Sequence, residues 1–319
     1  MFKKIAVSLL LLLLVLVVAF FVMKVPDTNP EQMIVKYGQG AIRIDDGLGG
    51  NIYYRDQGRS DGPVLLLLHG GNSSMQTWNG MINVLASSYR IISFDLYGHG
   101  ITGKHPKHDY SASALIEGAV KVLDAANVDQ AVWVGNSMGG WLTWRAALAV
   151  PKRVSGIVLM DASGAQGGEE PDLYLAAKLI KSPIVQKLSE YITPRFIMES
   201  SIEDNYADKT KITDQLIEQY WELFRFPGNR EAVAYRVNVS REPEMWNRVN
   251  EIKQPTLLMW GEQDVIVPFS DAALFQEKIP HSELVSYPNA SHLQWKSYRL
   301  TSPMILINGC SVMLFNDAA

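Results

Sequence analysis

Short apolar runs alternate along the chain with segments of helical periodicity. The runs are rich in leucine and β-branched residues and predict strands at Asn51–Asp56, Val64–His69, Arg90–Phe94, Ala131–Val134, Gly156–Met160, Thr256–Trp260 and Glu283–Tyr287. Between them, Leu115–Ala126 is amphipathic and its helix is expected to stop at Asn127. This alternation predicts an α/β fold with a mostly parallel central sheet and helices on both faces. The first strand is expected to be antiparallel.

The alternation of strands and helices breaks between residues 163 and 253. This stretch has helical periodicity without strands, in the segments Leu173–Ile180, Ile184–Ile192 and Ile212–Phe224. We expect a helical cap over residues 163–253, inserted into a core formed by residues 41–162 and 254–293. Its aromatic residues are candidates for a substrate pocket, although packing of the cap on the sheet is the favoured role for each of them: Tyr206, Trp221, Phe224 and Phe226.

The N-terminus carries a long apolar run behind two lysines, Lys3 and Lys4. Residues 5–23, at about 1.5 Å per residue, would span about 28 Å, close to the thickness of a bilayer core. The sequence therefore predicts a signal anchor at residues 1–24, with a transmembrane helix and a tether at residues 25–40. The lysines would keep the N-terminus cytoplasmic and place the catalytic domain in a periplasmic or extracellular space. Secretion after cleavage of a signal peptide is the alternative.

Composition narrows the range of functions. The chain has 319 residues, of which 47% are hydrophobic, and a formal net charge of −4. No basic run alternates with aromatic residues, which argues against nucleic-acid binding. Cys310 is the only cysteine, so neither an intrachain disulfide nor a cysteine metal site is possible. The sequence has no phosphate-binding glycine loop or dinucleotide fingerprint, and we expect no cofactor and no metal.

The segment Gly135–Gly139 has the pattern G-x-S-x-G, with Ser137 at its centre. It lies between a predicted strand and a helical pattern that begins at Gly140. A serine in this setting is typical of a nucleophile elbow, a strained turn that holds the hydroxyl clear of the sheet. The backbone N–H of the next residue, Met138, would then point at a developing oxyanion.

The other groups that a serine nucleophile requires, namely an oxyanion donor, an acid and a base, also follow predicted strands. The turn His69-Gly70-Gly71-Asn72 offers a second oxyanion N–H, from Gly71 in preference to Asn72. Asp264 lies on the loop after a later strand, and His292 lies just past the last one. The order serine, aspartate, histidine is that of α/β-hydrolases.

On these residues the chain resembles α/β-hydrolase-fold enzymes of the serine esterase and lipase type, over about Ile42 to His292. The resemblance implies that Ser137 attacks a carboxylic ester, that His292 takes and returns its proton, and that Asp264 orients the imidazole. It also implies an oxyanion hole formed by Gly71 and Met138. The expected partner is a small-molecule ester, with the membrane contacted through residues 5–23.

Other residues compete for these roles. Asp161 also follows a strand and is the alternative acid, although the Gly-Glu-Gln-Asp loop favours Asp264. His292 is preferred as the base because the remaining histidines precede the last strand or belong to other turns: His69, His99, His105, His108 and His281. Asp95 is expected to accept hydrogen bonds from loop amides, and Trp78 to pack the first helix of the core.

The tail departs from the resemblance. Related enzymes follow the base histidine with a proline, an acid, a second proline and a closing helix, whereas residues 294–319 have no helical period. Trp295 has the single codon TGG and the codon of Lys296 begins with AA, so a shifted frame spells glutamate. Restoring one base before Gln294 permits the sequence His-Leu-Pro-Met-Glu-Glu-Leu-Pro. We therefore hypothesise a frameshifted tail after Leu293, which the coding DNA would test.

Several functions share this site. Ester hydrolysis is the expected one, and serine at the elbow argues against dehalogenases and epoxide hydrolases, which use aspartate there. The segment Gly135–Gly140 also resembles hydrolases that cleave carbon–carbon bonds of ring-fission products, but their oxyanion turn is usually richer in glycine and proline. Perhydrolase or acyltransferase activity, or a non-catalytic binding protein with a relic triad, are further alternatives.

Overall fold

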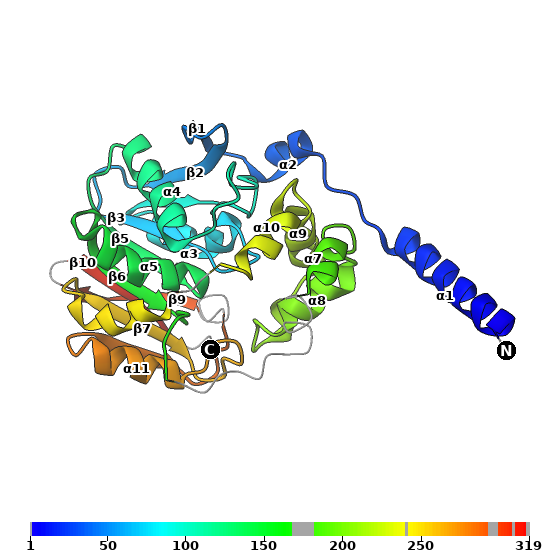
Figure 1. Ribbon diagram of the computed structural model, residues 1–319. Coiled ribbons are helices and arrows are strands. Elements are labelled where there is room, and N and C mark those ends of the chain that lie inside the picture. Colours follow the sequence, from blue (N-terminus) through cyan, green and yellow to red (C-terminus); the bar gives the residue numbers. More distant parts are fainter. Residues whose placement is uncertain (1, 168–181, 240–241, 293–298, 308–309, 317–319) are drawn as a thin grey trace.

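The structure is a computed structural model of the chain (Figure 1). It describes all residues except 1, 168–181, 240–241, 293–298, 308–309 and 317–319, and it leaves out the side chains of residues 2–4, 6, 243 and 299–316. The described helices are α1 (Phe2–Met23), α2 (Pro30–Tyr37), α3 (Asn79–Leu85), α4 (Ala112–Ala125), α5 (Met138–Ala149), α7 (Pro183–Ser189), α8 (Arg195–Glu203), α9 (Asp214–Phe224), α10 (Asn229–Arg236) and α11 (Ser270–Lys278). Short 3₁₀ segments are η1 (Met75–Trp78), η2 (Pro151–Arg153), η3 (Lys209–Lys211) and η4 (Pro243–Glu251).

The strands form one large sheet and one hairpin. Their bounds are β1 (Ile42–Asp45), β2 (Asn51–Gly58), β3 (Val64–Leu68), β4 (Arg90–Phe94), β5 (Ala131–Asn136), β6 (Val154–Met160), β7 (Thr256–Gly261), β8 (Glu283–Tyr287), β9 (Arg299–Ile307) and β10 (Cys310–Asn316). The 8-stranded sheet has the order β1-β2-β4-β3-β5-β6-β7-β8. β2 pairs antiparallel with both β1 and β4, and the pairs from β4 through β8 are parallel. The predicted mostly parallel sheet with an antiparallel early strand is confirmed.

Both faces of the sheet are apolar because alternate residues of each buried strand point to opposite sides. In β3, Leu66 and Leu68 face the cluster that contains α4, α5 and α11, whereas Leu65 and Leu67 face α3. Figure 1 shows α5 and α11 in front of the strands. Trp78 is fully buried against α3, as predicted. Because both faces of the sheet are covered, the loops that follow the parallel strands lie at the carboxyl ends of these strands.

The helices α7 to α10 lie beside this edge (Figure 1) and come from the segment predicted as a cap. Among the described residues of that segment, none belongs to the large sheet. α7 and α9 overlap two of the predicted helices, and the third, Leu173–Ile180, lies outside the described residues. The aromatic residues named for the cap are buried or partly buried within apolar clusters: Tyr206, Trp221, Phe224 and Phe226.

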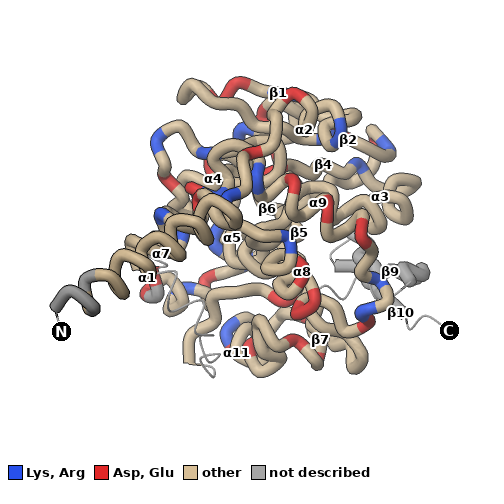
Figure 2. Tube along the Cα trace, turned by 90° about the vertical axis from the view of Figure 1, so that its right-hand side faces the viewer, with Lys and Arg blue, Asp and Glu red and all other residues tan. Residues whose placement is uncertain are grey.

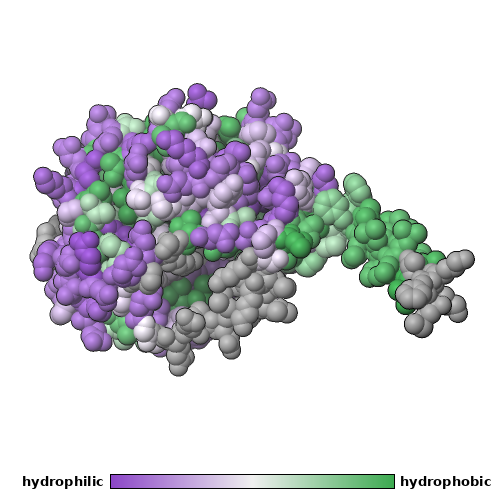
Figure 3. Space-filling view, viewed as in Figure 1, coloured by the Kyte–Doolittle hydropathy of each residue, from purple (hydrophilic) through white to green (hydrophobic). Residues whose placement is uncertain are grey.

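The prediction of an N-terminal transmembrane helix is wrong. Residues of α1 project from the body with apolar side chains exposed (Figures 1 and 3). Among the described residues, however, no helix has the length and apolar character that crossing a bilayer requires. The predicted membrane contact through residues 5–23 and the periplasmic or extracellular location inferred from it are therefore not supported.

Residues 25–40, predicted to be a tether, contact the cap. The N–H of Val25 donates to the Tyr191 carbonyl at 2.9 Å, and that of Thr28 donates to the Arg225 carbonyl at 3.0 Å. Arg230 of α10 pairs with Asp27 at 2.5 Å. This segment therefore contacts two separate parts of the predicted cap, at Tyr191 and at Arg225 and Arg230.

Charged residues are spread over the body with both signs interspersed (Figure 2). No large face carries Lys and Arg alone in this view.

Asp95 follows β4 and is fully buried. Its two carboxylate oxygens accept from the N–H groups of Met75 at 2.7 Å and Ile101 at 2.8 Å, as the sequence predicted for this residue. Burial raises the pKa of Asp95 to about 6, against the opposing effect of these two bonds. The carboxylate thus ties two loops to the sheet edge.

Asp95→Asn is expected to lower the free energy of unfolding at pH 8 by about 2 kcal/mol, because an amide offers one acceptor oxygen for two buried N–H groups. Urea denaturation would measure the change, with the exposed Asp129→Asn as the matched control. A loss no larger than that of the control would contradict this account of the loops.

Candidate active site

Ser137 lies in a strained turn between β5 and α5. Its φ of 54° and ψ of −116° are rare for a residue with a side chain. The turn is held by its backbone, since the Ser137 N–H donates to the Met160 carbonyl at 3.0 Å. Both neighbouring glycines are required: an added Cβ would lie 2.2 Å from the Gly139 oxygen at Gly135, and 2.1 Å from the Leu68 oxygen at Gly139. The predicted elbow has the local geometry of a nucleophile turn.

His69 sets the direction of the oxyanion turn. Its Nε2 accepts from the Leu96 N–H at 3.1 Å, so its Nδ1 carries the proton and donates to the Gly70 carbonyl at 2.8 Å. Burial lowers the pKa of His69 to about 4, which keeps this ring neutral. A trans peptide points its C=O and N–H in opposite directions. The Gly71 N–H therefore points away from His69, and Gly71 lines the same pocket as Ser137.

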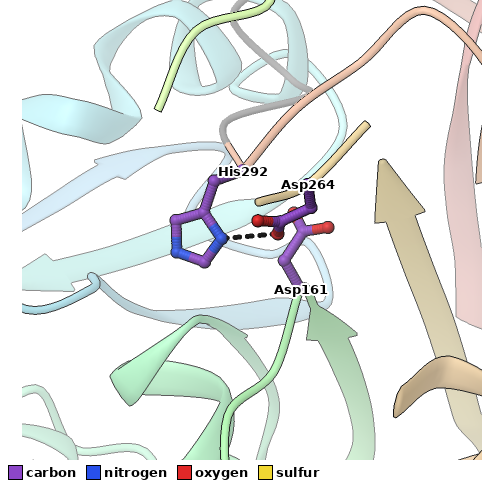
Figure 4. Close-up of side chains that lie close together, drawn as sticks. All are labelled: Asp161, Asp264 and His292. Atoms are coloured by element: carbon purple, nitrogen blue, oxygen red, sulfur yellow. Dashed lines mark hydrogen bonds and ion pairs between the residues drawn. The ribbon is translucent and has the colours of Figure 1, made fainter. Parts of the chain in front are cut away.

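His292 and Asp264 form a direct pair (Figure 4). The His292 Nδ1 donates to the Asp264 Oδ2 at 2.6 Å, and both side chains are buried. The other oxygen of Asp264 accepts from the N–H groups of Ile266 at 2.7 Å and Val267 at 2.9 Å. These bonds stabilise the charged carboxylate and fix the imidazole with its proton on Nδ1, which leaves Nε2 as the nitrogen that can take a proton.

The three loops are tied to one another by hydrogen bonds. The side chain of Asn136, next to the elbow, donates to the carbonyls of Met160 and His292, each at 3.2 Å. The acid loop reaches the histidine loop through the Gln263 N–H, which donates to the Ala290 carbonyl at 2.9 Å. Ser137 and His292 are thereby held at one edge of the sheet.

Ser137, Gly71 and His292 line one small cavity of about 60 Å³. The remaining lining comes from the oxyanion turn and from the cap: Gly70, Asn72, Ser73, Asn136, Met198, Ser201, Ile202, Asn205 and Tyr220. None of the aromatic residues named from the cap sequence is among them, and Tyr220 is the aromatic that the sequence analysis missed. Its hydroxyl lies 3.3 Å from the Ser73 hydroxyl. The adjacent aromatic residues Tyr220 and Trp221 indicated that this part of the cap could contribute to a pocket. Helical periodicity alone did not show which of the two lines the pocket of Ser137.

Asp161, the alternative acid, lies close behind the pair (Figure 4). Its Oδ1 accepts from the Gly261 N–H at 2.9 Å, and its own N–H donates to the Met259 carbonyl at 3.0 Å. The potential ligand atoms of Asp161, Asp264 and His292 all lie within 4.8 Å of one another. The imidazole is hydrogen-bonded to Asp264 through Nδ1. Asp161 instead holds the end of β7, from which the acid loop begins.

These three side chains do not have the spacing of a metal site. Two ligands that share a tetrahedral zinc ion at about 2.1 Å each lie about 3.4 Å apart. The 2.6 Å separation of His292 Nδ1 and Asp264 Oδ2 is shorter than this and is that of a charge-assisted hydrogen bond.

The other histidines lie outside the serine pocket. The ring Nδ1 of His99 bonds the Tyr97 carbonyl, that of His105 accepts from backbone N–H groups, and the ring of His108 stacks on Tyr235. His281 is exposed at the far end of the sheet and contacts the Gln254 carbonyl.

Asp271, in the first turn of α11, is half-buried near the acid loop. Burial and, second, the charge of Asp264 raise its pKa to about 6, whereas an unfolded aspartate titrates near 3.9. The folded state then binds the proton more tightly, so ionisation of Asp271 costs stability as pH rises from about 4 to about 6.

We expect Asp271→Asn to raise the free energy of unfolding by about 1 kcal/mol at pH 8, after allowance for solvent screening and for the favourable helix dipole. The difference should vanish near pH 4. Urea denaturation at both pH values measures it, and a difference independent of pH would contradict the titration.

Comparison with known proteins agrees with the observed fold. Residues 63–179 match the family model of the alpha/beta hydrolase fold. The uncharacterized hydrolase YugF of Bacillus subtilis is 29% identical over 77% of this chain and 89% of its own. A 2-hydroxy-6-oxononadienedioate/2-hydroxy-6-oxononatrienedioate hydrolase of Burkholderia vietnamiensis is 27% identical over 82% of this chain and 92% of its own.

Among solved structures, a thermophilic esterase from Thermogutta terrifontis superposes with a TM-score of 0.65 at 24% identity. The match covers 79% of this chain and 91% of the esterase. The sheet order, the cap beside its carboxyl edge and the matched segment agree on one assignment. The chain has an alpha/beta hydrolase fold and resembles hydrolases and esterases that share this fold.

Proposed function

We propose that the protein is a serine hydrolase that cleaves carboxylic esters through an acyl-enzyme. One observation carries the proposal: Ser137, on a strained elbow, shares a pocket with His292, whose Nδ1 is held 2.6 Å from a buried carboxylate. A histidine held in this tautomer can act as a base toward a nearby hydroxyl through Nε2. The fold alone would not justify the activity, because many chemistries share it.

In the proposed mechanism the Ser137 Oγ attacks the ester carbonyl while its proton passes to Nε2 of His292. The carbonyl oxygen becomes an oxyanion that accepts hydrogen bonds from the N–H groups of Gly71 and Met138. Collapse of this intermediate breaks the bond to the alkoxy group, which leaves with the proton from His292. Water then attacks the acyl-serine and gives a proton to His292. The second tetrahedral intermediate collapses, the acid leaves, and His292 returns the proton to the Ser137 Oγ. Asp264 stays ionised and stabilises the imidazolium in each half of the cycle.

The purified full-length chain should hydrolyse p-nitrophenyl acetate, butyrate and laurate, and the rates along this series would measure the acyl pocket. A fluorophosphonate probe should label the protein with a stoichiometry of one and abolish turnover. Labelling without ester turnover would point to another acyl or carbon–carbon substrate. Neither labelling nor turnover in a folded sample would refute the serine mechanism.

Carbon–carbon hydrolysis of a ring-fission product is the second candidate. The observation that favours it is the relative from Burkholderia vietnamiensis, whose name specifies a 2-hydroxy-6-oxo dienedioate substrate. The same serine, histidine and oxyanion groups would serve a substrate with a vinylogous ketone. Decay of the dienolate absorbance of such a compound, measured beside the ester assay, distinguishes the two activities by their relative kcat/KM.

A further inference from the structure

A cap arginine contacts the oxyanion turn. Arg236, the last residue of α10, donates from Nη2 to the side-chain oxygen of Asn72 at 2.9 Å, across 164 positions of sequence. Asn72 follows Gly71 in the turn and has a φ of 56°, a conformation that asparagine tolerates better than most residues. A residue of α10 thus holds one end of the turn that carries the proposed oxyanion donor, the Gly71 N–H.

The other terminal nitrogen of Arg236 contacts Nε2 of His99. His99 is buried, and its pKa lies well below its usual value because of burial and the neighbouring charge of Arg236. The ring is therefore neutral. Its Nδ1 lies 3.0 Å from the Tyr97 carbonyl and must carry the proton to donate there, so Nε2 is free to accept from the guanidinium. The planar fork of an arginine suits this pair of acceptors better than the point charge of a lysine.

The His99 ring packs edge-on against the His69 ring, with centroids 4.9 Å apart. His69 in turn donates to the Gly70 carbonyl and sets the direction of the Gly71 N–H. Arg236 therefore supports the turn from two sides, directly through Asn72 and indirectly through the edge-on contact of His99 with His69. Both histidines are neutral, so neither ring repels the positive charge of Arg236.

We propose that Arg236 is a positioning residue that couples the cap to the oxyanion hole, an inference that rests on the proposed function. With Arg236 in place, the Gly71 N–H is fixed before the substrate carbonyl becomes negative. Without it, the turn loses its outer support and the donor has to be oriented during the reaction, which weakens stabilisation of the transition state more than binding of the substrate. Movements of α10 would thereby change the rate of the chemical step.

The test compares full-length wild type with Arg236→Met, which keeps most of the aliphatic length of the side chain and removes the fork. We expect kcat for p-nitrophenyl butyrate to fall by about 10-fold to 100-fold with KM changed less than about 3-fold. The inhibition constant of a trifluoromethyl ketone, which forms an oxyanion on the serine, should rise by the same factor as kcat falls. Arg236→Lys should lie between the two because one ammonium cannot satisfy both acceptors.

Arg248→Met is the matched control, since this cap arginine is exposed and pairs with Glu251 of its own 3₁₀ segment. Asn72→Ala tests the same link without altering the cap helix, and should reproduce part of the loss. In the double variant Asn72→Ala with Arg236→Met, the loss should be smaller than the product of the single losses.

Three results would overturn the inference: an unchanged kcat in Arg236→Met, a rise in KM alone, or a loss that the fall in folded fraction explains, with Asn72→Ala fully active. These are read against a wild type that hydrolyses the ester. A folded wild type without turnover or probe labelling would instead refute the proposed function, and the inference with it.

Discussion

Ser137→Ala is expected to lower kcat for p-nitrophenyl ester hydrolysis by about 10⁴-fold or more, because the variant lacks the oxygen that forms the acyl-enzyme. The remaining rate would come from the oxyanion donors and from binding alone. Steady-state kinetics with purified full-length protein measures the loss. Melting temperature should stay close to that of wild type, since the hydroxyl of Ser137 has no described structural hydrogen bond to replace and the backbone bonds of the turn persist.

Ser113→Ala is the matched control, because Ser113 is an exposed serine near the start of α4 and bonds only to the Ser111 hydroxyl among its described contacts. It should retain wild-type kcat and fluorophosphonate labelling, whereas Ser137→Ala should lose both. Full activity of Ser137→Ala would mean that the ester is cleaved elsewhere, and the elbow would then have a different role.

Much of the core was predictable because its signals are local. The strands β4 and β8 have the bounds that the apolar runs indicated, and the G-x-S-x-G pattern predicted the sharp turn at Ser137. These features depend on residues adjacent in sequence, where side-chain period and glycine spacing determine the backbone. β1 was missed although its residues Ile42–Asp45 alternate between apolar and polar, because four residues are the shortest run that indicates a strand.

Long-range contacts were not predictable in the same way. The link from Arg236 to Asn72 joins a cap helix to a core turn, and nothing in either local sequence specifies the partner. The same holds for Tyr220, which lines the pocket, whereas its neighbour Trp221 packs against the same apolar cluster without lining the pocket. Helix periodicity gives the apolar face of a helix, but the packing angle decides which residue at the margin of that face reaches the serine.

At residues 5–23 a strong local signal led to a wrong prediction. The hydropathy and flanking lysines of this run predicted a membrane span, yet no described helix meets the requirements for one. The frameshift proposed for the tail after Leu293 stays a prediction. The described backbone of this tail forms the antiparallel hairpin of β9 and β10 where related enzymes have a closing helix, and the coding DNA would decide whether a frame change produced it.

The choice between Asp264 and Asp161 was open in the sequence because each follows a parallel strand. In the structure the Asp264 Oδ2 contacts the imidazole, while Oδ1 accepts from two backbone N–H groups. In Asp264→Asn the amide oxygen would keep the backbone bonds, so the NH₂ group would face His292. An NH₂ donor there favours an unprotonated Nδ1 and puts the proton on Nε2, which is the wrong tautomer for a base.

We therefore expect Asp264→Asn to lower kcat by about 10³-fold to 10⁴-fold with little change in KM. Asp161→Asn is the matched control, since it removes a second buried carboxylate beside the pair but keeps an oxygen for the Gly261 N–H. Its kcat should fall less than about 10-fold. Kinetics at pH 8, with melting temperatures recorded for both variants, separates loss of base function from loss of fold. A large loss in Asp161→Asn beside a small one in Asp264→Asn would reverse the assignment and make Asp161 the acid that supports His292.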